Sequence, residues 1–142
     1  MERPRINIRA VLVAALLMFI IGWGWYWVFV SVWLEGAGLT NVQMQGMSGG
    51  QQLLAFGGSF VAYALLFYVM AHFVAYTNPT TAKQGMQTGF WCWLGFVATS
   101  LFVIYNYQLR PISLWLVDAG YWLVSMLAGG ALLAVWRRKT AP

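Results

Sequence analysis

Charged residues are scarce in this chain. Only 8% of its 142 residues are charged, with three acidic and eight basic side chains. A soluble domain carries about 25% charged residues, and so few charges could not cover a surface in contact with water. A soluble globular protein is therefore excluded, and most of the surface is expected to face hydrocarbon.

Cysteine and histidine are nearly absent as well. The single cysteine, Cys92, excludes an intrachain disulfide and is expected to be a small buried hydrophobe. The single histidine, His72, cannot form a metal-binding cluster, and no Gly-x-Ser-x-Gly elbow, phosphate-binding loop or pair of carboxylates is present. We therefore expect a protein that is not an enzyme, with no catalytic residue, metal or cofactor. Contact with lipid, a quinone or a pigment stays open.

Long apolar runs are what the chain does have, since 61% of its residues are hydrophobic. A helix that crosses a bilayer needs about 20 apolar residues. Backbone polar groups in lipid must be satisfied within the segment, so such runs predict helices. We expect an all-α polytopic membrane protein, a single four-transmembrane-helix domain over residues 1–142. Its helices are predicted at about Ile8–Val30, Leu53–Tyr76, Gly85–Asn106 and Ile112–Trp136.

The connections differ in length. The two short ones, Thr77–Lys83 and Tyr107–Pro111, contain proline and predict antiparallel neighbouring helices. In the long connection from Ser31 to Gln52, Thr40 can cap a short surface helix over Asn41–Met47. The glycines of this connection are expected to break helix elsewhere or to end it, namely Gly36, Gly38, Gly46, Gly49 and Gly50.

The basic residues lie at the ends of the apolar runs rather than in a patch interleaved with aromatic residues, so nucleic acid binding is not expected. Positive residues accumulate on the cytoplasmic side of membrane proteins. Arg110 is the only basic residue on the side of the membrane opposite the two termini, and all the others lie on the side of the termini. This bias predicts that both termini are cytoplasmic, in a bacterial inner membrane. The first helix is expected to be a retained anchor rather than a cleaved signal peptide. The residues on the cytoplasmic side are Arg3, Arg5, Arg9, Lys83, Arg137, Arg138 and Lys139.

Asp118 is the only acidic residue inside a long apolar run. A carboxylate at such a depth costs about 2.5 kcal/mol or more unless it is paired or wetted, so it marks a candidate site. Tyr121, Ser125 and Gly129 follow at helical spacing, and this face is expected to point into the bundle. Asp118 could be a structural carboxylate paired with a tyrosine, a protonatable or cation site, or a contact between subunits.

The depth of each residue in the membrane, estimated from the helix rise, indicates which residues could be partners of Asp118. At about 1.5 Å per residue, Ser59, Ser100 and Tyr26 fall at a similar depth on the other three helices, whereas His72 lies about 20 Å deeper. An Asp118–Arg110 pair is left open, since Arg110 could instead extend to the headgroups. Asn106, near the same end of the third helix, is a further polar candidate.

Small and aromatic residues suggest contact surfaces. Gly85, Gly89, Gly58 and Gly129 are expected to let helices approach closely. Tryptophans near helix ends, including Trp91, Trp93 and Trp115, are expected to anchor at the membrane interface. The cluster Trp23, Trp25 and Trp27 could instead form an aromatic face for a ligand or a partner helix.

Two segments resemble a known family. Residues Trp93-Leu94-Gly95-Phe96-Val97-Ala98-Thr99, and Arg110-Pro111 followed by Leu114-Trp115-Leu116-Val117-Asp118-Ala119-Gly120-Tyr121, resemble the bacterial membrane family called domain of unknown function 1761. Phe19–Trp27 and Leu39-Thr40 are similar too, although family members often carry charges where this chain has Asn41–Gln45. The resemblance implies a single four-helix domain with Arg110, Asp118 and Tyr121 as shared polar residues, and it implies no activity.

Two functions fit these features. The first is a non-enzymatic membrane protein that acts through helix packing, as a homo-oligomer or a small accessory subunit of a membrane complex. Its partners would be the lipid bilayer and itself or another membrane protein. The alternative is a small transporter or channel in which Asp118 lines an outward-open site.

Overall fold

The computed structural model describes residues 5–137, and these form helices and turns without any strand. Four of the helical segments are long and apolar enough to cross a membrane, namely Ile8–Val28, Gly49–Thr77, Ala82–Tyr107 and Ile112–Val135. The prediction of an all-α protein with four spanning helices is therefore confirmed. Of the basic residues used to predict orientation, Arg3, Arg138 and Lys139 lie outside the described residues.

The first and fourth spans are single helices, α1 (Ile8–Val28) and α8 (Ile112–Val135). The second span joins α4 (Gly49–Leu53), the π-helical segment η1 (Leu54–Gly58) and α5 (Ser59–Thr77). The third joins α6 (Ala82–Cys92), the π-helical segment η2 (Trp93–Ala98) and α7 (Thr99–Tyr107). Two short helices, α2 (Val30–Ala37) and α3 (Asn41–Gln45), lie between the first and second spans.

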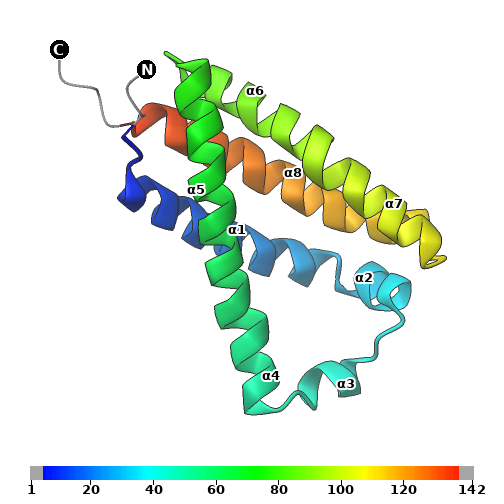
Figure 1. The fold of residues 1–142 in the computed structure, drawn as a ribbon. Helices are drawn as coiled ribbons and strands as arrows, with labels where there is room; N and C mark the ends of the chain where they lie inside the picture. Colours follow the sequence, from blue (N-terminus) through cyan, green and yellow to red (C-terminus); the bar gives the residue numbers. More distant parts are fainter. Residues whose placement is uncertain (1–4, 138–142) are drawn as a thin grey trace.

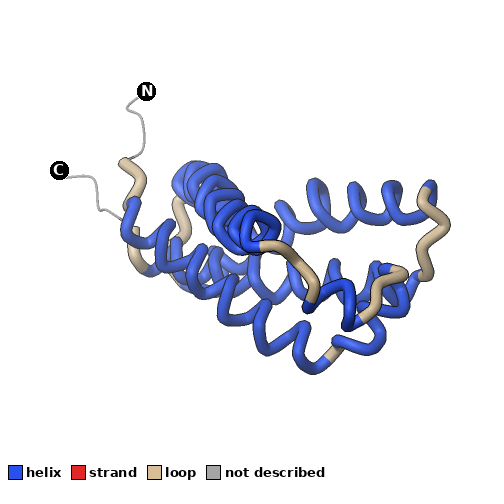
Figure 2. Tube along the Cα trace, turned by 90° about the horizontal axis from the view of Figure 1, so that it is seen from below, coloured by secondary structure: helices blue, strands red, loops and turns tan. Residues whose placement is uncertain are grey.

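The helices α1, α8 and α6–α7 lie side by side, and α5 crosses them at a steep angle (Figures 1 and 2). The start of α1 and the end of α8 meet at one end of the bundle, which we call the terminal end; the opposite end is the distal end. The second span has 29 residues, about 44 Å of helix at 1.5 Å per residue. This exceeds a hydrocarbon core of about 30 Å, so a strong tilt is expected.

The two short turns orient the helices that they join in different ways. Across Pro111 the third and fourth spans are antiparallel neighbours, as predicted, whereas the second and third spans diverge from their turn at Asn78 (Figure 1). Asn78 has a left-handed backbone with φ of 46° and ends α5. Thr81 then caps α6 through a reciprocal pair of hydrogen bonds with Gln84.

The long connection is more helical than the sequence predicted. Thr40 does cap a short helix, through reciprocal hydrogen bonds with Gln43, but α2 was not predicted. Gly36 lies inside α2, where the absence of a side chain allows the helix to approach Leu114 of α8. Gly38, with φ of 68°, and Gly46 end helices as expected. Residues Gly49 and Gly50 begin α4 instead of breaking it, because Ser48 caps that helix.

Glycines hold α6 against α8. A Cβ atom added at Gly85 would collide with the backbone carbonyl of Gly130, and one added at Gly89 would collide with the carbonyl of Met126. Gly129 accommodates the ring of Phe67 in the same way. Gly58, in contrast, is exposed and faces only its own helix, so the expectation that it packs against another helix is wrong.

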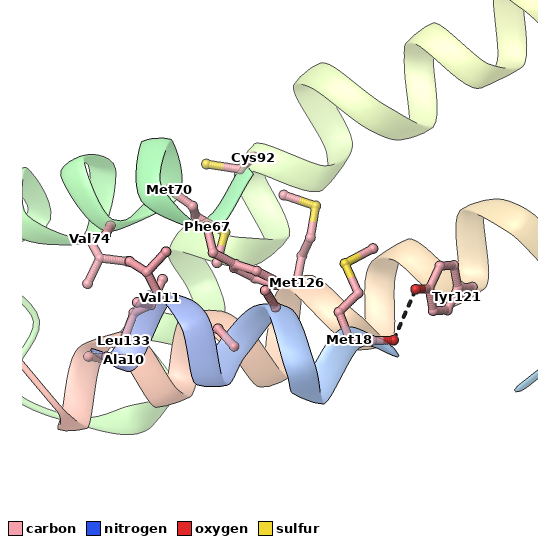
Figure 3. Close-up of a cluster of buried hydrophobic side chains, with 14 residues drawn as sticks. Ala10, Val11, Met18, Phe67, Met70, Val74, Cys92, Tyr121, Met126 and Leu133 are labelled. Atoms are coloured by element: carbon pink, nitrogen blue, oxygen red, sulfur yellow. Dashed lines mark hydrogen bonds between the residues drawn. The ribbon is translucent and has the colours of Figure 1, made fainter. Parts of the chain in front are cut away.

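The apolar core lies toward the terminal end, where α1, α5 and α8 cross (Figure 3). Phe67 of α5 is completely buried among side chains that include Met18 of α1 and Met126 of α8. Small residues of α1, such as Ala14 and Ala15, are also fully buried and bring the helices together. The core therefore closes the terminal half of the bundle.

We predict that Gly85→Ala lowers the melting temperature of the purified protein. The new methyl group has to displace backbone of α8, and the typical destabilisation by overpacking is about 1–3 kcal/mol. Thermal unfolding in detergent measures the effect. The matched control is Gly95→Ala in the same span, where a Cβ would meet nothing within 4 Å. Equal melting temperatures for the two variants would contradict the close approach of α6 and α8.

Candidate functional site

Asp118 lies in the distal half of α8 and is held by two tyrosines from other helices. The hydroxyl of Tyr26 on α1 donates to Asp118 Oδ1 at 2.6 Å, and the hydroxyl of Tyr105 on α7 donates to Oδ2 at 2.6 Å. Asp118 is only 7% exposed. Each carboxylate oxygen therefore receives one hydrogen bond, and the pair of bonds connects three spanning helices.

These two hydrogen bonds reduce the free-energy cost of burying a carboxylate within lipid. Hydrogen bonds to a charged group contribute about 1.5–3 kcal/mol each, and more is lost when such a buried group has no partner. Two tyrosines supply donors but no positive charge. The carboxylate oxygens also keep lone pairs that a further donor can use, because an ionised carboxylate has about four acceptor positions.

Other polar bonds fix the position of α8 around Asp118. The indole of Trp25 on α1 donates to the carbonyl of Val117 at 2.9 Å, and the indole of Trp93 in η2 donates to the carbonyl of Ala119 at 2.8 Å. Tyr121 donates to the carbonyl of Met18 at 3.0 Å (Figure 3). The residues on either side of Asp118 are thus anchored to both neighbouring spans.

Beside Asp118 is a cavity of about 920 Å³ between α1, the distal half of the second span and α8. Most of its wall is apolar or aromatic, and its polar side chains include Tyr26, Tyr105, Tyr121 and Ser59. Asp118 is the only Asp, Glu, Lys or Arg among the described lining residues. The aromatic lining residues that belong to this wall are Phe19, Trp23, Tyr26, Trp27, Trp33, Phe56, Tyr63, Tyr105, Tyr121 and Trp122.

The cavity exists because the second span leaves the bundle in its distal half (Figure 1). The segments α4 and η1 chiefly contact each other and the start of α5. Leu54 and Phe56 are consequently exposed, by 76% and 58%. A π-helical turn such as η1 often occurs where a helix changes direction or serves a site. Lipid would meet the cavity along this open side.

Several aromatic rings around the cavity also contact one another. Phe19 and Tyr63 pack edge to face at 5.6 Å between ring centroids, and Tyr63 packs on Trp122 at 6.0 Å. Tyr26 contacts both Tyr121 and Trp33, at 5.2 and 5.6 Å. Such pairs are stabilising, so these contacts help to hold the part of the wall next to Asp118 in place.

The structure brings some of the predicted polar residues together and not others. Ser59 lines the cavity, and Tyr121 is buried beside Tyr26. Ser100 is exposed and is not a neighbour of the cavity, so it is not a partner of Asp118. Asn106 is also exposed and donates to the carbonyl of Phe102 in its own helix at 2.9 Å, which removes it from the site.

Arg110 does not pair with Asp118. Its Nη1 donates to the carbonyls of Ala37 and Gly36, at 2.7 and 3.4 Å, and so binds the end of α2. Ser125 is 1% exposed, and its hydroxyl has no hydrogen-bond partner within residues 5–137. His72 is engaged within α5, where its Nδ1 donates to the carbonyl of Tyr68 at 2.9 Å.

The tryptophans separate into different roles. Trp23 and Trp27 are exposed and line the cavity, whereas Trp25 lies against Gly120 of α8, so the three do not form one face. The expectation that Trp93 and Trp115 anchor at the membrane interface stays a prediction, but both residues also join two helices. Their indoles donate to the carbonyls of Ala119 and Ala98, bonds that join η2 to α8.

Tyr105 was not predicted from the sequence. Depth counted on backbone positions selected Ser100, but side chains lean toward the N-terminus of their helix. Tyr105 on α7 therefore reaches toward the terminal end, while Asp118 on the antiparallel α8 reaches toward the distal end. Because of these opposite directions, the residue of α7 that reaches Asp118 lies about one turn closer to the distal end than Ser100, and that residue is Tyr105.

The comparisons place the chain in a family. A family model described as Protein of unknown function (DUF1761) matches residues 9–134. The chain belongs to the DUF1761 family. The matched region contains the whole Tyr26–Asp118–Tyr105 arrangement of this DUF1761 protein. No curated protein and no solved structure matches the chain with significant similarity.

We predict that Tyr26→Phe and Tyr105→Phe each destabilise the protein, by about 1.5–3 kcal/mol, because each removes a hydrogen bond to a buried carboxylate. Thermal unfolding in detergent measures both. Tyr107→Phe is the matched control, since Tyr107 is 88% exposed. If the two site variants unfold at the temperature of the control, Asp118 does not depend on these hydroxyls.

Proposed function

We propose that this protein binds lipophilic organic cations in the cavity beside Asp118. The observation that carries the proposal is the pairing of one carboxylate with an aromatic wall in a space of about 920 Å³. Pockets for small molecules are usually about 300–1,000 Å³, mostly apolar, with a few convergent polar groups. The function proposed is binding rather than catalysis.

Charge complementarity supports a cation over a neutral or anionic ligand. Asp118 receives two hydrogen bonds but no salt bridge from Arg110, whose guanidinium is engaged by Ala37 and Gly36. In a medium of low dielectric constant the attraction of an unpaired carboxylate for a cation is much stronger than in water. A bound cation would provide the positive partner that the lining lacks.

The aromatic wall supports an organic cation over a metal ion. Rings such as Tyr26, Trp23 and Trp27 attract cations over their faces and also bury apolar groups. A metal ion would require several oxygen ligands, whereas Asp118 is the only carboxylate among the described lining residues. A cation with aromatic or alkyl substituents uses both the charge and the wall.

The position of the cavity supports a role in transport. It opens beside the distal half of the second span, and the packed core around Phe67 closes the terminal half. We place the termini in the cytoplasm of a bacterium, because Arg5, Arg9 and Lys83 lie at the terminal end. The protein would then be a small transporter with its site open toward the outer half of the inner membrane.

Assembly is the second candidate function, as a homo-oligomer or an accessory subunit. The exposed arm formed by α4 and η1 favours it, because the small exposed residues Ala55 and Gly58 on this arm could accept another helix at close range. Asp118→Asn separates the two functions. Loss of cation binding with an unchanged oligomeric mass supports the binding function, whereas loss of assembly supports the second.

Binding is tested with two ions of similar size and opposite charge, tetraphenylphosphonium and tetraphenylborate. We predict that the protein in lipid nanodiscs binds tetraphenylphosphonium saturably in calorimetric titration and does not bind tetraphenylborate, after correction with empty nanodiscs. Asp118→Asn should weaken the binding by about tenfold or more. The matched control is Glu35→Gln, which removes the same charge from an exposed position on α2.

Two results would contradict the proposal. One is equal binding of both ions to the wild-type protein, which would mean that the cavity selects only for apolar surface. The other is an equal effect of Asp118→Asn and Glu35→Gln, which would mean that net charge rather than the site governs binding.

A further inference from the structure

A second and smaller cavity lies at the terminal end, where the start of α1 meets the ends of α5 and α8. Its volume is about 140 Å³. Its floor is apolar, with Ala10, Ala71 and Leu133 from the three helices, and all three residues also belong to the buried core. Its polar lining residues are Asn7, Asn78, Arg5 and Arg137, and the last two are basic.

Arg137 is oriented by its neighbours. Its Nη1 donates to the side-chain oxygen of Asn78 at 2.8 Å, and Asn78 is fixed by its position at the left-handed end of α5. The Nε atom of Arg137 is buried and has no hydrogen-bond partner within residues 5–137. A buried donor without a partner is unfavourable. The guanidinium carries five N–H donors, and the bond to Asn78 uses only one of them.

The lining is positively charged without compensation from the described acidic residues. These are Glu35 and Asp118, and both lie toward the distal end. Asn7 is committed to structure, since it accepts from the backbone of Arg9 and donates to the carbonyl of Trp136. Two arginines that line one small cavity fit an oxyanion, because arginine binds oxyanions through pairs of N–H groups.

The location favours the phosphate of a lipid over a free phosphate ion. The cavity lies at the ends of three helices that belong to spanning segments, and the ends of spanning helices are where lipid headgroups are expected. Trp136, which is 43% exposed, is a typical anchor for that level. The apolar floor offers a surface for glycerol and the first acyl carbons, which a free anion would not use.

We propose that this cavity binds the phosphate group of an anionic phospholipid from the leaflet at the terminal end, with Arg5 and Arg137 as its ligands. Basic pockets between helices on the cytoplasmic side are known to suit such headgroups. The site is independent of the cation cavity, because the two cavities share no lining residue.

Native mass spectrometry of the detergent-purified full chain, titrated with phosphatidylglycerol, tests the proposal. One lipid should bind tightly to the wild-type protein. Arg5→Gln and Arg137→Gln should each weaken this binding by about tenfold. Arg9→Gln is the matched control, because Arg9 is exposed at the same end and does not line the cavity. Arg5 precedes α1 and is exposed, so Arg5→Gln keeps the test valid if Arg137→Gln disturbs folding.

Three outcomes would overturn the site. Equal weakening by Arg9→Gln would show diffuse attraction to positive charge. Full displacement of phosphatidylglycerol by millimolar inorganic phosphate would show a free anion site. Unchanged lipid binding in both Arg5→Gln and Arg137→Gln would show that neither arginine is a ligand.

Discussion

The burial of one carboxylate within the membrane is the constraint on which the distal half of this protein depends. Asp118 is satisfied only when Tyr26 of α1 and Tyr105 of α7 both reach it. Those two bonds fix the spacing of three helices at the distal edge of the apolar core, which includes Tyr121 and against which Tyr26 packs. Because the partners are neutral donors, they stabilise the carboxylate and leave it without a counter-charge among residues 5–137. The same arrangement thus provides both a structural joint and an unpaired acidic group beside a cavity.

The cavity in turn follows from an uneven distribution of packing. Glycines allow α6 to pack closely against α8, and small residues allow α1 to pack closely against α5 and α8 near Phe67. The second span is longer than the others and tilts, so its distal part, α4 and η1, moves away from the bundle. The space between is walled by aromatic residues that pack on one another and on the joint at Asp118. The tilt of the second span therefore accounts both for the open cavity in the distal half and for the closed core in the terminal half.

Much of the fold follows from the sequence, because run length and hydropathy determine which segments span a membrane. The inward face of α8 and the partner Tyr26 were accessible from helical spacing and depth. Tyr105 was not, since the depth estimate ignored the opposite lean of side chains on antiparallel helices. Gly58 and Asn106 were misjudged for a related reason: a small or polar residue has the same spacing whether it faces a neighbour or lipid. The tilt of the second span depends on packing against other helices, which no local pattern encodes.

Asp118 is the only aspartate in the chain, so its carboxyl group can be observed alone. Nuclear magnetic resonance of protein labelled at the side-chain carboxyl carbon of aspartate gives a single signal from the proposed site. If the cation binds beside Asp118, this signal will shift when tetraphenylphosphonium is added to saturation and will stay in place with tetraphenylborate. A signal that does not move while tetraphenylphosphonium binds the protein would contradict the account, because the cation would then lie away from Asp118.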